Sequence, residues 1–128
     1  MSGFKNKQRA IRRMRAIGPA VRRGARIQME KNAIELVETQ KSFAPVDEGE
    51  LRDSIRQFDT SNAERISRRV IADAKDEKGR PIANWVEHGT SRSVARPFFW
   101  PAYRLLRRRF KTRMTRQARK DIGEAIKK

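Results

Sequence analysis

The chain has 128 residues, the length of a single domain, and its apolar and charged fractions are both 37%, so we expect only a modest hydrophobic core. The absence of cysteine excludes disulfide bonds, thiolate chemistry and cysteine metal ligands. The formal net charge of +17 predicts an acidic partner, and no apolar run is long enough to predict a signal peptide or a membrane partner.

Two segments hold most of the positive charge. Residues 1–26 contain nine Lys and Arg and no acid, and residues 104–120 contain nine more, again without an acid. Residues 27–103 between them carry twelve basic and thirteen acidic residues. This pattern predicts a nearly neutral body with two cationic arms that meet nucleic acid or an acidic protein surface, although it also fits solvated helix faces that keep the chain soluble. The arginines expected to contact such a partner are Arg9, Arg12, Arg13, Arg15, Arg22, Arg23, Arg107, Arg108, Arg109, Arg113 and Arg116.

The first third of the chain is expected to be helical. Residues 5–16 fit a basic helix, which Gly18 and Pro19 should break or kink because proline lacks an amide donor. A second helix is expected from residue 19 to about residue 42, and Pro45 follows its end. Its apolar stripe recurs every four residues at Val21, Ala25, Met29, Ala33 and Val37, flanked by Ile34 and Leu36.

The middle of the chain predicts a turn followed by a β-hairpin. Asp47 and Glu50 have the spacing of a capping-box variant for a short helical turn, and a plain acidic loop is an equal alternative. Residues 54–59 and 66–73 are rich in alternating apolar residues and predict two strands. Thr60-Ser61-Asn62 is expected to lie in the connection between them.

The last part predicts a loop, a short helix and a long helix. Residues 75–81 fit a polar loop at a mobile tip, residues 83–88 fit one or two helical turns, and Gly89 fits the left-handed residue that ends them. Residues 93–99 could add an extended segment. The long helix is expected to begin at Pro101 and to run to about residue 125. Its stripe is Ala102, Leu106, Phe110, Met114, Ala118, Ile122 and Ile126.

The aromatic residues gather at the junction between the short helix and the long one. We expect Trp85, Phe98 and Trp100 to be largely buried there, because a mostly hydrophilic chain that clusters its aromatics uses them to lock elements together. The junction therefore predicts assembly rather than chemistry. The residues expected to form this structural joint are Trp85, Gly89, Thr90, Pro97, Phe98, Trp100 and Pro101.

Candidate catalytic and metal-binding residues are few. His88 is the single histidine, it follows Glu87, and no second histidine or cysteine is present to complete a metal site. No phosphate-binding glycine loop and no nucleophile elbow occurs. We expect a protein that is not an enzyme and that uses no cofactor and no metal.

Nucleic-acid binding through the cationic helices is the alternative function. Single-strand binders interleave aromatic and basic residues on one surface. In this chain the aromatics lie in the neutral body and the cations lie in the helices, which favours core packing for the aromatics. No helix-turn-helix, homeodomain or zinc-finger pattern supports sequence-specific reading, so the alternative is a nonspecific nucleic-acid-binding protein.

Four short motifs occur in a fixed order within residues 44–102, with a helix expected on each side. The motifs are Ala44-Pro45, then Gly49-Glu50-Leu51-Arg52-Asp53-Ser54-Ile55, then Ala83-Asn84-Trp85-Val86-Glu87-His88-Gly89-Thr90, and then Pro97-Phe98-Phe99-Trp100-Pro101-Ala102. In this order they resemble the tail-completion, or head–tail joining, family of long-tailed bacteriophages. Residues 1–16 form an extra basic arm that the resemblance does not cover.

The resemblance implies a single α+β domain over residues 1–128, with a small antiparallel β-sheet packed by a long N-terminal helix and a long C-terminal helix. It implies a structural protein of the virion neck, made in the host cytoplasm, that forms a homo-oligomeric ring, commonly a hexamer. As a tail terminator, such a ring caps the tail and contacts neighbouring neck, connector and tail-tube proteins. The resemblance leaves a head-closure ring open as an alternative. It also allows nonspecific contact with genome DNA in the lumen.

Overall fold

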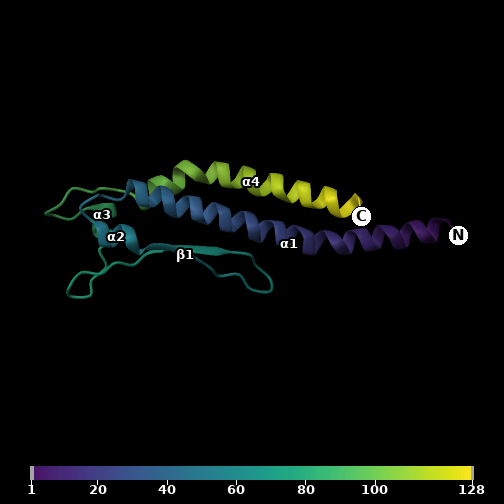
Figure 1. Cartoon of the computed structure of the whole chain (residues 1–128), viewed down its shortest axis with the longest axis horizontal. Helices are drawn as coiled ribbons and strands as arrows, with labels where there is room; N and C mark the ends of the chain where they lie inside the picture. The colour runs from purple at the N-terminus through teal and green to yellow at the C-terminus, as the bar shows by residue number, and fades with distance from the viewer. Residues whose placement is uncertain (1, 128) are drawn as a thin grey trace.

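The computed structural model describes residues 2–127, with side chains described from residue 5, so Met1 of the expected arm lies outside the described residues. The chain forms α1 (Ser2–Phe43), α2 (Gly49–Ser54), β1 (Ile55–Asp59), β2 (Arg68–Ala72), α3 (Ala83–His88) and α4 (Phe99–Lys127). The two long helices run antiparallel side by side, and the hairpin packs along α1 (Figure 1). The expected α+β architecture is confirmed.

The predicted break at Gly18 and Pro19 is wrong, because α1 continues through both residues. Proline at this position removes one backbone hydrogen bond from the helix. The proline ring normally clashes with the Cβ of the residue before it, but Gly18 has no Cβ and its surroundings are open. The predicted basic helix and the helix after it are therefore one element.

The strands agree with the sequence-based expectation to within two residues at each end. β1 and β2 pair antiparallel, with Ile55 opposite Ala72 and Asp59 opposite Arg68. Within residues 2–127 the sheet consists of these two strands. Residues 93–97 form no strand, so the possible extended segment adds nothing to the sheet.

The predicted capping box at Asp47 is also wrong. The residue before α2 is Glu48, and no side chain caps that helix. Asp47 instead accepts a hydrogen bond from the Arg96 guanidinium at 2.9 Å, and Glu48 pairs with the same guanidinium at 3.4 Å. The acidic loop between α1 and α2 thus binds Arg96, in the segment that leads into α4.

Two adjoining clusters form the core. Where the short elements meet, Leu51, Ile55 and Phe98 are at most 1% exposed and pack with Ala44 and Val86. Beside them, Leu36 of α1 packs against Ala102 and Leu106 of α4. Both clusters lie at one end of the molecule, so the long helices extend well beyond the core (Figure 1).

The apolar stripe of α4 is buried at its start and exposed at its end. Ala102 and Leu106 are buried, whereas Ile122 is 36% and Ile126 is 44% exposed, and Ala125 is buried in their place. Residues four apart are offset by about 40° around a helix, so such a stripe turns away from a straight neighbouring helix. The helix begins at Phe99, two residues before the expected Pro101.

Candidate functional site

The joint between α3 and α4 is built around a buried carboxylate. Glu87 is 7% exposed, and its two oxygens accept hydrogen bonds from the backbone N–H groups of Phe98, Phe99 and Trp100 at 2.9, 2.9 and 3.0 Å. The first N–H groups of a helix have no partner within the helix, and they carry the positive end of its dipole. The first turn of α4 contains no acidic residue of its own. The negative charge near the start of this helix therefore comes from Glu87 of α3.

The expected burial of both tryptophans is wrong. Phe98 is fully buried, but Trp85 is 36% and Trp100 is 50% exposed. The Arg80 guanidinium lies 5.1 Å from the ring centre of Trp85. Trp100 lies edge-on to Phe99 and to Tyr103, with ring centres 5.3 and 6.1 Å away. The joint therefore has one apolar plug, Phe98, and a partly exposed row of aromatic rings on α4.

The other predicted joint residues have local roles. Gly89 ends α3 with φ of 77°, and a Cβ there would come within 2.7 Å of the Ala95 backbone nitrogen, so glycine is required. The Thr90 hydroxyl oxygen accepts hydrogen bonds from the N–H groups of Arg92 and Ser93, which closes the next turn. Pro97 is exposed, and Pro101 is half-buried in the first turn of α4.

The predicted contact arginines divide into three groups. Arg109 and Arg113 both bind Glu35 of α1, and hydrogen bonding from Arg113 is the main reason that the pKa of Glu35 is lowered. Arg22 donates a hydrogen bond to the Asn62 carbonyl at 3.3 Å. The remaining members form no ion pair within the part of the chain that the structure describes. They are Arg9, Arg12, Arg13, Arg15, Arg23, Arg107, Arg108 and Arg116.

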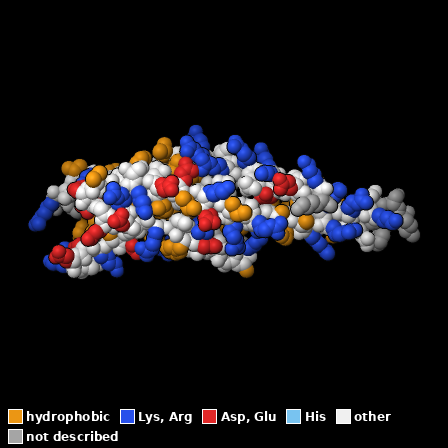
Figure 2. Space-filling model, viewed as in Figure 1, with side chains coloured by type: hydrophobic (Ala, Val, Ile, Leu, Met, Phe, Trp, Pro, Cys, Tyr) orange, Lys and Arg blue, Asp and Glu red, His pale blue; other side chains and the backbone are white. Residues whose placement is uncertain are grey.

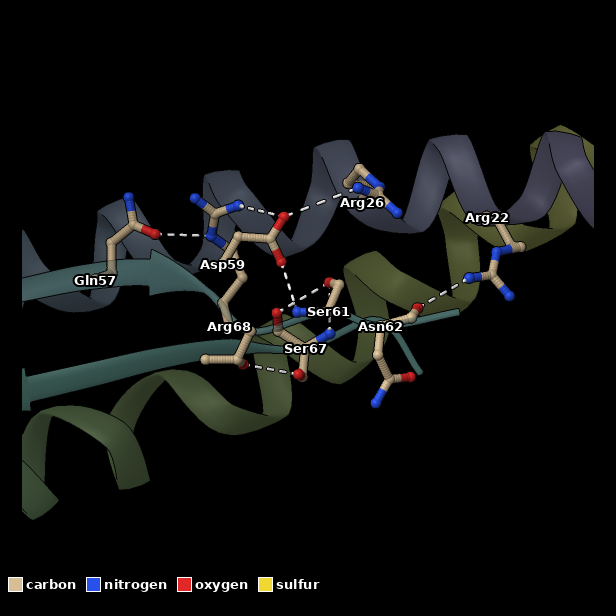
Figure 3. Close-up of polar contacts among 9 residues, drawn as sticks. Arg22, Arg26, Gln57, Asp59, Ser61, Asn62, Ser67 and Arg68 are labelled. Atoms are coloured by element: carbon tan, nitrogen blue, oxygen red, sulfur yellow. Dashed lines mark hydrogen bonds and ion pairs between the residues drawn. The ribbon is translucent and has the colours of Figure 1, made fainter. Parts of the chain in front are cut away.

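The tip of the hairpin is tied to α1 by a polar network (Figure 3). Asp59 lies between Arg26 of α1 at 3.8 Å and Arg68 of β2 at 3.9 Å. Hydrogen bonding from Ser61 is the largest cause of the lowered pKa of Asp59, and the two arginines add to it. The network holds the hairpin against the helix that carries the N-terminal cations.

A groove lies between β2 and α4, with α1 as its floor. A cavity of about 400 Å³ is bordered by Leu36, Val70 and Phe110, and a second of about 320 Å³ is bordered by Val70 and Trp100. Because Val70 borders both, we treat them as one feature, the β2–α4 groove. Its other α4 residues include Tyr103, Arg107, Lys111 and Met114.

His88 and the neighbouring carboxylate do not form an acid–base pair. His88 is exposed, and the carboxylate beside it is engaged by three backbone donors. Among the described residues, no three His, Asp or Glu side chains gather closely enough to hold a metal ion. None of the helices over residues 2–127 combines the length and apolar character needed to span a membrane.

Sequence reasoning missed Glu87 and Gln40. The Gln40 side chain is fully buried and donates a hydrogen bond to the Phe99 carbonyl at 3.2 Å, so α1 and α3 both hold the start of α4. A signal for Glu87 existed, because a long basic helix that begins without a Ser, Thr, Asp or Asn cap needs an acceptor from elsewhere. Comparison with protein-family models, curated proteins and solved structures finds no match to this chain.

Proposed function

We propose that this protein is a structural, non-enzymatic subunit of the neck of a long-tailed bacteriophage. In this proposal it forms a closed homo-oligomeric ring, a hexamer, that terminates the tail and joins it to the head. The ordered motifs within residues 44–102 motivate the proposal, and the exposed surface of the chain is the single observation that carries it beyond resemblance.

The exposed surface supports assembly, because it is larger than that of a compact monomer of the same mass. A compact monomer of 14.9 kDa exposes about 7,000 Å², whereas this chain exposes 9689 Å². The excess of about 2,700 Å² per chain is enough for the two contacts that a subunit makes in a ring, since a standard interface buries about 800 Å² of each partner. A closed ring covers such surface through repeated head-to-tail contacts between subunits.

The N-terminal part of α1 is almost entirely exposed over residues 5–16. It extends past the C-terminal end of α4, and Figure 2 shows Lys and Arg without acidic side chains at this end. Ile11 is 39% and Met14 is 70% exposed on the same segment. A helix that carries both exposed apolar residues and cations is suited to docking on an acidic protein.

Ring formation can be tested directly with the purified chain. Light scattering coupled to size-exclusion chromatography should give a single species of several subunits, and electron microscopy should show rings. A chain that stays monomeric at all concentrations, and that is absent from the neck when labelled in assembled particles, would contradict the proposal. The position of the label relative to head and tail also distinguishes a tail terminator from a head-closure ring.

The role of the basic arm can be tested separately. Deleting residues 2–16 should leave the core intact, because both core clusters lie at the opposite end of the molecule. It should weaken the attachment of tails to heads most strongly at low salt, because high salt already screens the electrostatic docking of the intact arm. Tails that join heads normally at every salt concentration would rule out docking by the arm.

Nonspecific nucleic-acid binding is the second candidate, favoured by the cations that have no ion-pair partner in the described chain. This function predicts that a fluorescent duplex binds the protein with a steep, linear dependence of the logarithm of affinity on the logarithm of salt concentration. Removing residues 2–16 should then reduce the slope. Duplex binding that is weak and nearly independent of salt would exclude this candidate without affecting the neck proposal.

A further inference from the structure

We propose that the β2–α4 groove binds an extended, acidic segment of a different protein, which adds to β2 as a third strand. This inference is independent of the neck proposal. It depends on a free strand edge, an aromatic wall and the charge of the rim, and it would hold for a monomer as well as for a ring.

The free edge follows from the register of the hairpin. The N–H of Thr60 donates to the carbonyl of Ser67 at 3.1 Å, which marks this facing pair as a hydrogen-bonded one. Such pairs alternate along an antiparallel ladder. The backbone groups of Arg68, Val70 and Ala72 therefore point away from β1.

This edge has no hydrogen-bonded neighbour in the described chain. No hydrogen bond from another described segment reaches the backbone of Arg68, Val70 or Ala72. An uncovered strand edge is a template for another extended chain, because it offers donors and acceptors in alternation. The groove places this template beside α4.

The wall opposite the edge is a partly exposed aromatic face of α4. Trp100, Tyr103, Phe110 and Met114 follow one another at spacings of three, seven and four residues along α4, so they share one face. All four border the groove, and Trp100 and Tyr103 are 50% and 40% exposed. A strand placed against β2 would cover these rings with its inward side chains.

The charge of the groove specifies the occupant. Arg107 and Lys111 border it from α4, both are exposed, and neither forms an ion pair with any described residue. Arg69 is exposed on the outer face of β2. A strand with apolar inward residues and acidic residues at its outer and terminal positions complements this arrangement.

The strands and the 91–97 coil of a second copy of this chain do not supply such a strand. β1 carries one acid, Asp59, which already lies between Arg26 and Arg68. β2 carries none, and the coil over residues 91–97 carries two arginines and no acid. Docking any of these in the groove would place cations against cations. A nucleic acid fits less well than a peptide, because phosphates offer only acceptors to an edge that also presents carbonyls.

The test uses a short synthetic peptide of alternating valine and glutamate with an extra glutamate at each end. Bound peptide should slow amide hydrogen exchange at Val70 and Ala72 on the order of tenfold or more, because both N–H groups become hydrogen-bonded. The same peptide with alternate amides N-methylated should give no protection. Unchanged exchange at both residues with the unmodified peptide at millimolar concentration would overturn the proposal.

Charge-reversal variants provide a matched comparison on one helix. The double variant Arg107→Glu with Lys111→Glu should weaken peptide binding by roughly tenfold. The control, Arg104→Glu with Arg108→Glu, makes the same change in net charge at two exposed α4 residues that do not border the groove. Equal weakening by the two variants, or displacement of the peptide by oligothymidylate, would overturn the assignment to a peptide strand.

Discussion

Replacing Glu87 by glutamine should destabilise the fold strongly, although the side chain keeps its size. The Glu87 oxygens accept three backbone hydrogen bonds at the start of α4, and a hydrogen bond to a charged group contributes roughly 1.5–3 kcal/mol. Glutamine retains one acceptor oxygen, loses the charge that favours a helix N-terminus, and turns an NH₂ group toward the third N–H. We expect a loss of about 3 kcal/mol from Glu87→Gln and about 5 kcal/mol from Glu87→Ala.

Urea unfolding followed by circular dichroism measures this loss. The matched control is Glu77→Gln, which makes the same chemical change at an exposed residue with no hydrogen bond or ion pair to the described chain. His88→Ala tests the exposed neighbour and should have little effect. If Glu87→Gln unfolds within about 0.5 kcal/mol of Glu77→Gln, the carboxylate does not hold α4 as we argue.

Phe98 and Trp100 should respond differently to truncation, because Phe98 is fully buried and Trp100 is half exposed: in urea unfolding, Phe98→Ala should cost about 3–5 kcal/mol and Trp100→Ala less than about 1.5. Equal losses would support the expectation that Trp100 is buried together with Phe98. An ideal Cβ on Gly24 would lie 1.6 Å from Asp121 Oδ2, so Gly24→Ala should be nearly neutral in thermal unfolding as that side chain rotates, whereas Gly24→Leu should separate the helices and cost about 1–3 kcal/mol. A leucine variant as stable as the alanine variant would show that α1 and α4 are not closely packed there. Hydrogen bonding from Arg113 lowers the pKa of Glu35 from its ordinary 4.5, so its stabilising contribution is complete above that pH and disappears as the pH falls through the lowered pKa. Urea unfolding at a series of acidic pH values should therefore show a shallower loss in Glu35→Gln than in the parent, and identical slopes would contradict the ion pair.

The order and type of the elements could be predicted from local patterns. Apolar residues spaced by four predicted the long helices, and the alternation around residues 54–59 and 66–73 predicted the hairpin. Gly89 was expected to end α3 through a positive φ, and its φ of 77° confirms this. These features depend on backbone preferences and periodicity, which act over a few residues and can be read directly from the chain.

The joint could be predicted only in part, because its contacts join residues far apart in sequence. Glu87 reaches the start of α4 more than ten residues away, and Gln40 reaches Phe99 across 59 positions. The sequence indicated that aromatics gather at this place but did not indicate which ring would be buried. Phe98 packs with residues of α2, β1 and α3, whereas Trp100 lies on the groove face of α4.

The sequence by itself determined the helices, the hairpin, the cationic ends and the absence of cysteine chemistry, because composition and periodicity are properties of the chain alone. Only the tertiary structure decided that Arg109 and Arg113 pair with Glu35 while Arg107 and Lys111 stay unpaired beside a free strand edge. These four basic residues lie close together in the sequence of one helix, between residues 107 and 113. Their roles differ because the rotation of α4 against α1 and β2 turns one pair toward a carboxylate and the other toward an open groove.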